Sequence, residues 1–233
     1  RCLSGAGQRR RATRGASSIV SKPSQVWLFR LVHMSNLEVY LHRQAMHAVN
    51  HTTQDGRGWT VTHRDDVQAR RAETPVPCGP GGTLHDYVPL YFGNRSPMLY
   101  QLHTGWVPGY RDGQQALVYL VLAFDDVVAA GLPFVFTDGH ACHEVTSFYD
   151  DPARVADVDL AAAAVRWWRP TAEDPDLQRR KQAEFLIYRS CPWQLVRGIA
   201  VLDESARDRA VAILGGHDAS QVRDVIIRPA WYY

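Results

Sequence analysis

The chain has 233 residues, enough for one large domain or two small ones, and 45% of them are hydrophobic, which suffices for a sizeable core. Its net charge at pH 7 is only +2, so no global electrostatic field points to a nucleic-acid partner. Four widely spaced cysteines without a CxxC pair argue against a disulfide framework and predict reduced thiols in the cytoplasm. No apolar run approaches the roughly 18 residues of a membrane-spanning helix.

The first 25 residues differ in composition from the rest. Residues 1–22 carry six basic side chains and no acidic one, so the remainder has a net charge of −4 (+2 minus 6). This segment has no apolar periodicity and no signal-peptide core, which predicts a disordered basic tail before one domain of residues 26–233. The first methionine is Met34. We hypothesise that the natural start lies near Val20 and that residues 1–19 are upstream sequence; the alternative is a basic arm for DNA phosphates.

In the first half, residues 26–32 read as a strand and residues 35–45 as a helix capped by Ser35, with Glu38 as its capping-box partner. Residues 51–84 are polar and rich in glycine and proline, which predicts a long functional loop. Residues 85–100 contain two apolar runs around a Gly-Asn-Arg-Ser-Pro break, which predicts a hairpin.

In the second half, short apolar strands alternate with a few helical segments. Because strands outnumber helices and most connections are short, the pattern predicts an α+β fold with mixed or antiparallel sheets. Strands are predicted at 116–123, 134–137, 183–188, 195–202 and 225–228, and helices at 125–130, within 151–169 and at 205–214.

Three side chains stand out chemically before any resemblance is considered. Arg95 lies among four aromatic residues, a setting that suits a ligand both aromatic and phosphorylated, although an ordinary hairpin with a surface arginine gives the same pattern. Glu184 opens an apolar strand, where a carboxylate is costly unless it is paired or reactive; the alternative is a solvent-exposed strand edge. His140 follows an Asp-Gly turn at the end of a predicted strand, where loops often carry functional residues. The alternative is an ordinary turn histidine.

Four blocks of the chain together resemble the DarT family, bacterial toxins that ADP-ribosylate DNA bases with NAD. The blocks are Arg30–Leu37, Asp86–Tyr100, Phe136–Ala141 and Gln182–Leu186, in the family's order. The likeness runs from about Trp27 to the terminal Trp-Tyr-Tyr. Arg30 and Val32 stand where some members carry His and Thr, so the chain is more similar to the guanine-modifying branch than to the thymine-modifying one.

The resemblance implies an ADP-ribosyltransferase-like fold of two packed, mainly antiparallel or mixed sheets with flanking helices, NAD as co-substrate and no metal. It implies a single-stranded DNA substrate and an antitoxin hydrolase or inhibitor as partner. It also implies three groups of site residues. These are the catalytic Glu184, Arg95 and His140, the NAD-binding Arg30, His33, Asn36, Tyr87 and Arg95, and the DNA-binding Arg179, Arg180 and Lys181.

The implied roles agree with the chemistry of the reaction. Cleavage of an N-glycosidic bond develops positive charge on the sugar, which a carboxylate stabilises. A base inside a duplex cannot reach such a site, so the enzyme acts on single strands or flips the nucleotide. Trp167, Trp168 and Trp193 are candidate stacking surfaces for bases, with core packing as the alternative for each.

Other function classes fit the same residues. A mono-ADP-ribosyltransferase that modifies protein would carry the same glutamate and arginine, and a thymine-specific enzyme or an idle NAD- or DNA-binding module remains open. A metal site at His140, Cys142 and His143 lacks good ligand spacing.

Overall fold

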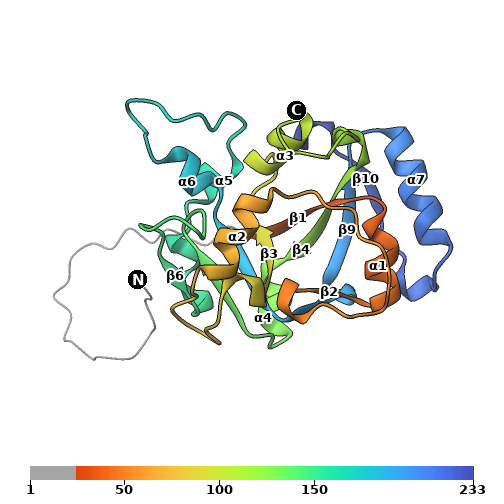
Figure 1. Ribbon diagram of the computed structural model, residues 1–233, viewed down its shortest axis with the longest axis horizontal. Coiled ribbons are helices and arrows are strands. Elements are labelled where there is room, and N and C mark those ends of the chain that lie inside the picture. The colour runs from red at the N-terminus through yellow and green to blue at the C-terminus, as the bar shows by residue number, and fades with distance from the viewer. Residues whose placement is uncertain (1–24) are drawn as a thin grey trace.

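The computed structural model describes residues 25–233, so the predicted basic tail lies, except for its last residue, outside the described residues. Within them, a central eight-stranded sheet has the order β10-β9-β4-β1-β3-β7-β5-β6, and a small second sheet pairs β2 with β8 (Figure 1). Neighbouring strands are antiparallel except for β9 and β10. The predicted α+β class is therefore confirmed.

The strands are short, as expected for a sheet of this kind. They are β1 Trp27–His33, β2 Ala45–His47, β3 Tyr87–Tyr91, β4 Leu117–Ala123, β5 Phe134–Thr137, β6 Phe148–Tyr149, β7 Glu184–Tyr188, β8 Ser190–Pro192, β9 Val196–Val201 and β10 Val225–Ile227.

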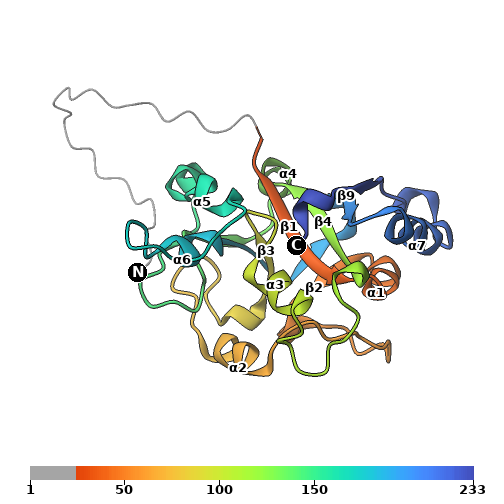
Figure 2. The same cartoon turned by 90° about the horizontal axis from the view of Figure 1, so that it is seen from above.

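Helices lie around this sheet, with α1 and α7 near one end of the molecule and α5 and α6 near the other (Figures 1 and 2). The α-helices are α1 Asn36–Arg43, α2 Asp65–Glu73, α3 Pro97–His103, α4 Phe124–Ala129, α5 Leu160–Ala164, α6 Leu177–Lys181 and α7 Glu204–Gly215. None of the helices within residues 25–233 is long and apolar enough to cross a membrane.

Strand β4 shows why the sheet needs cover on both faces. All seven of its residues are buried. Successive side chains of a strand point to opposite faces. Val118, Leu120 and Leu122 accordingly join one apolar cluster, whereas Leu117, Tyr119 and Val121 join another. The second cluster includes α3 residues and the chain's last three residues, which places the C-terminus against the sheet.

The predicted hairpin at residues 85–100 is wrong in its second half. β3 pairs with β1 and β7, and the chain then enters α3. Ser96 caps this helix by accepting a hydrogen bond from the Leu99 N–H, and Pro97 occupies the first turn. Both residues are favoured at a helix N-terminus, a local signal that the alternating pattern concealed.

The predicted loop at 51–84 and the capping box at Ser35 also differ from the structure. The loop contains α2, whose acidic first turn and basic last turn match the helix dipole. Ser35 makes no side-chain cap; its hydroxyl instead hydrogen-bonds Thr60 Oγ1 at 2.8 Å and His33 Nδ1 at 2.7 Å. The other predicted strands, and the helices within 35–45, 125–130, 151–169 and 205–214, are confirmed.

The turn after β3 packs closely against the end of α5. A Cβ at Gly93 would lie 1.8 Å from the backbone oxygen of Ala163, which a side-chain movement cannot relieve. Glycine is therefore required here by the approach of two backbones.

Gly93→Ala should destabilise the fold, because overpacking against backbone costs about 1–3 kcal/mol or more. We expect a fall in melting temperature of roughly 5 °C or more, since about 1 kcal/mol shifts it by 2–4 °C at this size. Gly58→Ala is the control, because a Cβ there meets nothing within 4 Å. Equal melting temperatures for the two variants, measured by circular dichroism, would show that the turn is not tightly packed.

Candidate active site

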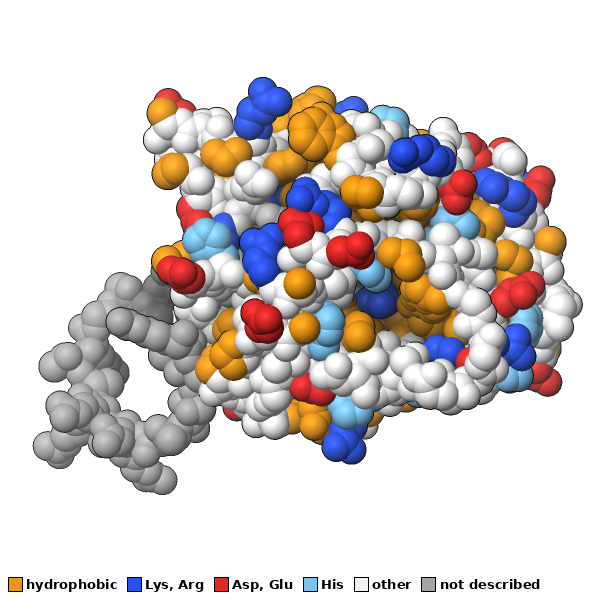
Figure 3. Space-filling model, viewed as in Figure 1, with side chains coloured by type: hydrophobic (Ala, Val, Ile, Leu, Met, Phe, Trp, Pro, Cys, Tyr) orange, Lys and Arg blue, Asp and Glu red, His pale blue; other side chains and the backbone are white. Residues whose placement is uncertain are grey.

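A pocket of about 540 Å³ opens beside the ends of β3 and β7. Its walls come from β1, α2, α3, the turn after β5 and the segment from residue 170 through α6. The face drawn in Figure 3 is hollowed in front of the central strands. Glu184 and His140 line this pocket together with five arginines, namely Arg30, Arg64, Arg70, Arg71 and Arg179.

Glu184 is the first residue of β7 and is only 1% exposed. Both carboxylate oxygens accept hydrogen bonds from Arg71 Nη1, at 3.2 and 2.9 Å, and Oε1 also accepts one from the Ala141 N–H at 3.0 Å. The Glu184 N–H donates to the Thr137 hydroxyl at 3.0 Å, which fixes the backbone from the neighbouring strand. The carboxylate is therefore buried, held in one orientation and compensated in charge.

Arg71 is the site residue that sequence reasoning missed. It lies on α2, 113 positions before Glu184, within the segment expected to be a loop. Burial opposes its charge, but the Glu184 carboxylate keeps the pKa of Arg71 above its usual value. Its Nη2 is buried without a hydrogen-bond partner in the described structure. A buried, unsatisfied donor in a pocket wall is placed to bind an acceptor on a ligand.

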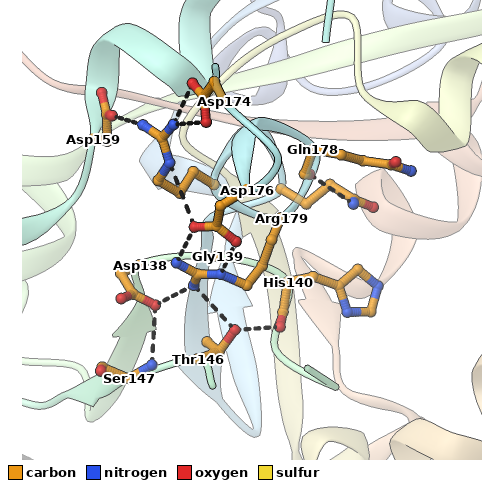
Figure 4. Close-up of polar contacts among 12 residues, drawn as sticks. Asp138, Gly139, His140, Thr146, Ser147, Asp159, Asp174, Asp176, Gln178 and Arg179 are labelled. Carbon is orange, nitrogen blue, oxygen red and sulfur yellow. Dashed lines mark hydrogen bonds and ion pairs between the residues drawn. The ribbon is translucent and has the colours of Figure 1, made fainter. Parts of the chain in front are cut away.

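His140 lines the pocket, and its surroundings favour the neutral imidazole. Burial lowers the pKa of this histidine, and the positive charges of Arg71 and Arg70 act in the same direction, whereas Glu184 opposes them. The Cys142 N–H donates to Nδ1 at 3.1 Å, so the ring proton lies on Nε2. Figure 4 shows the imidazole pointing away from the charged cluster around Arg179. A neutral ring of this tautomer can donate a hydrogen bond from Nε2 to a ligand.

Of the other predicted NAD-binding residues, Arg30 lines the pocket, and its guanidinium donates to the Pro89 carbonyl at 2.7 Å. Asn36 lies outside the lining: it exchanges two hydrogen bonds of 2.9 Å with the backbone of Thr60. His33 also lies outside it, with Nε2 3.2 Å from an Asp112 carboxylate oxygen. Through its two bonds to Thr60, Asn36 holds the start of a segment whose residues 62–64 line the pocket.

The structure places Arg95 and Tyr87 away from the pocket lining. Arg95 is buried in the left-handed region at φ +51°, and its Nη1 donates to the carbonyls of Ala230 and Tyr232. Its guanidinium also lies 4.4 Å from the centre of the Tyr233 ring. Tyr87 is buried at the far end of β3, where its hydroxyl donates to the Gly81 carbonyl at 2.7 Å. These contacts hold both side chains outside the pocket lining, and their direct contact with NAD stays a prediction.

The three basic residues of α6 are already engaged within the fold, and Figure 4 shows the contacts of Arg179. Arg179 lines the pocket but pairs with Asp138 and Asp176, each at 2.8 Å. Arg180 pairs with Asp159 and Asp174.

Lys181 is buried and donates to the carbonyls of Asn94 and Ala163 at 2.7 and 2.6 Å; burial lowers its pKa to about 8. The charges of Arg179, Arg180 and Lys181 are thus neutralised or buried within the fold, which leaves little positive charge for DNA phosphates.

The three candidate stacking tryptophans occupy different environments. Trp193 is completely buried, with its indole N–H bonded to the Gln221 carbonyl, so core packing is its role. Trp168 is half-buried and donates to the Tyr233 hydroxyl at 2.6 Å. Trp167 is 73% exposed. Within residues 25–233, no group of three or more His, Cys, Asp or Glu side chains is arranged to hold a metal ion.

Comparison with known proteins matches this chain to one protein family. Residues 29–233 match the family model described as "ssDNA thymidine ADP-ribosyltransferase, DarT". A DNA ADP-ribosyl transferase of Thermus sp. (strain 2.9) is 36% identical over 91% of this chain and 98% of its own length. One of Escherichia coli O127:H6 is 34% identical over 91% of this chain and 95% of its own length.

Solved structures agree with this. Thermus sp. 2.9 DarT in complex with ADP-ribosylated ssDNA matches with a TM-score of 0.83 and 35% identity, over 91% of this chain and 98% of that one. The same protein in complex with NAD+ matches with a TM-score of 0.80 and 34% identity, over 91% of this chain and all of that one. The fold is therefore that of an ADP-ribosyltransferase. The chain belongs to the DarT family of DNA ADP-ribosyltransferases, which confirms the predicted family and enzyme class.

The Arg71–Glu184 pair generates a prediction about stability. Arg71→Met leaves a buried carboxylate without its partner and should cost about 3–5 kcal/mol of unfolding free energy. The double variant Arg71→Met/Glu184→Gln should lose less than the sum of the single variants, because it leaves no unpaired buried charge. Urea unfolding of the four proteins measures the coupling. Strict additivity would mean that the two groups do not interact.

The lowered pKa of His140 predicts a pH dependence of stability. The unfolded chain protonates this histidine near pH 6.5 and the folded chain only at lower pH, so the unfolded state binds more protons as the pH falls through 6.5. Unfolding free energy should therefore decrease on acidification from pH 7.5 to 5.5. His140→Gln should lessen this decrease without abolishing it, because burial also lowers the pKa values of His33, His47, His63 and His85. Urea unfolding across this range is the measurement; an identical pH dependence in the variant contradicts the assignment.

Proposed function

We propose that this chain transfers ADP-ribose from NAD to a guanine base in single-stranded DNA and acts as the toxin of a toxin–antitoxin system. The observation that carries the proposal is the buried Glu184 carboxylate, held by Arg71 and the Ala141 N–H inside the pocket. Family membership and the ssDNA and NAD+ complexes of a DarT relative support the choice of substrates.

The residues of the pocket divide the work of the reaction. As the bond between nicotinamide and ribose C1′ breaks, nicotinamide leaves with the electron pair and C1′ becomes positive; Glu184 stabilises that charge. A nitrogen of the base then bonds to C1′ and releases its proton to solvent. His140 donates a hydrogen bond from Nε2 and orients the base.

The arginines suit the remainder of NAD. A diphosphate is bound well by planar guanidinium groups, and Arg30 and Arg71 both line the pocket. The unsatisfied Arg71 Nη2 supplies a donor for an oxygen of the nicotinamide ribose or of the diphosphate. Asn36 supports this site through its bonds to the Thr60 backbone, and His33 does so through the Ser35 hydroxyl, which also bonds Thr60. Arg95 supports it by joining the start of α3 to the C-terminus.

The acceptor base is proposed from the sequence pattern at Arg30 and Val32. The family description, which names thymidine, favours thymine as the second candidate. An antitoxin hydrolase or inhibitor as partner and a cytoplasmic location belong to the same proposal.

The test is mass spectrometry of oligonucleotides that differ at one base after reaction with NAD. We expect a mass increase of one ADP-ribose on guanine-containing single strands. The mass increase on strands with thymine but no guanine would correct the base, whereas no mass increase on any oligonucleotide would overturn the DNA substrate.

Glu184→Gln should reduce transfer by at least about 100-fold, the effect of removing one electrostatic stabiliser, with the Kd for NAD changed only a few-fold. Glu204→Gln, on the exposed start of α7, is the matched control. Transfer by Glu184→Gln at the control rate would exclude the catalytic role.

A further inference from the structure

Three aromatic side chains beside the pocket are left in solvent. Trp106 is 71% exposed, Trp167 is 73% exposed and Tyr100 is 40% exposed. Large aromatic rings contribute most when they are buried, so a group of them on the surface marks a binding site.

These rings lie on two segments that also form the pocket wall. On one segment, Tyr100 stands between Met98 and Gln101, and Trp106 directly precedes Val107; Met98, Gln101 and Val107 all line the pocket. On the other, Trp167 lies three residues before Pro170, another lining residue.

The two segments touch each other at the pocket edge. The Tyr100 ring lies 5.8 Å from that of Trp168, and Trp168 donates to the Tyr233 hydroxyl, which anchors the α5–α6 loop. In Figure 3, hydrophobic and basic side chains lie side by side at the top of the molecule, where Figure 1 places α3 and the α5–α6 loop.

Two uncompensated positive charges accompany the rings. Arg166 and Arg169 are exposed, and neither forms an ion pair with any residue in the described part of the chain. The Arg166 guanidinium lies 5.5 Å from the centre of the Trp167 ring. The basic residues of α6, by contrast, are neutralised by aspartates or buried. Free positive charge on this side therefore sits with the exposed tryptophans; we call Tyr100, Trp106, Arg166, Trp167 and Arg169 the rim surface.

We propose that the rim surface binds the nucleotides that flank the target base, with bases stacked on Trp106 and Trp167 and phosphates paired with Arg166 and Arg169. Exposed aromatic rings interleaved with free cations match a single strand, because every base has a face to stack and every linkage carries a negative charge. This inference rests on the proposed function, since it assumes that the acceptor is single-stranded DNA.

A strand held at the pocket edge also explains how one base enters the pocket. Flanking contacts offset the cost of unstacking the target nucleotide, which is a few kcal/mol. The 2.6 Å hydrogen bond from Trp168 to the Tyr233 hydroxyl fixes the residue next to Trp167, which lowers the entropic cost of ordering this segment on binding.

The experiment measures binding of a fluorescein-labelled, random-sequence oligodeoxynucleotide of about 16 nucleotides by fluorescence anisotropy. Trp106→Ala and Trp167→Ala should each weaken binding about tenfold, with the salt dependence unchanged. Arg169→Ala should weaken binding and reduce the slope of log K against log salt by about 0.7, the value for one phosphate contact on a single strand. All three side chains are exposed, so the variants should fold as the wild type does.

The controls are Trp27→Ala, at a tryptophan that is 43% exposed and lines a different cavity, and Arg207→Ala on α7. NAD affinity should be the same in all variants. Rim variants that bind the oligonucleotide as tightly as the controls would overturn the proposal and assign the surface to another partner, such as a protein. Failure of the wild type to modify any DNA would instead contradict the proposed function, and the binding data would still decide the rim surface.

Discussion

The buried ion pair between Arg71 and Glu184 is the interaction on which the site depends. A carboxylate that is 1% exposed cannot keep its charge in an apolar sheet without a partner, and Arg71 with the Ala141 N–H supplies that partner. The same pair attaches α2 to the start of β7 and so closes one wall of the pocket. Within residues 25–233, Arg71 Nη2 has no hydrogen-bond partner, which leaves one donor of the pair available to a ligand.

The distribution of arginines explains how a nearly neutral protein can serve a polyanionic substrate. Arg179 and Arg180 stabilise α6 through aspartates, and Arg95 stabilises the C-terminus through backbone carbonyls. These charges are used within the fold. Arginines without an acidic partner among the described residues remain in the pocket and on its edge, where they lie beside exposed aromatic rings. Because a net charge of +2 gives no global positive field, this local concentration of positive charge takes its place.

The last three residues connect regions that are distant in sequence. Tyr232 donates to carbonyls of β4 and β9, and Tyr233 bonds both Trp168 and the Arg95 carbonyl. The C-terminus therefore joins the central sheet, the start of α3 and the α5–α6 loop. In the sequence, this aromatic end marks only where the likeness to the family stops, whereas in the structure it supports two segments that form the pocket wall.

From the sequence alone, the strands, most helices, the α+β class, the family and the prominence of Glu184 and His140 could be predicted, because periodicity and short motifs are local. Ser96-Pro97 and the charge pattern of α2 were also local signals, but alternation and low apolar content masked them. Tertiary structure alone decided that Arg71, 113 residues away, is the partner of Glu184, and that Arg95 and Tyr87 bond to backbone carbonyls outside the pocket lining. Pairing and burial arise from contacts between distant segments, and a residue's type does not determine which of its possible partners the fold brings to it.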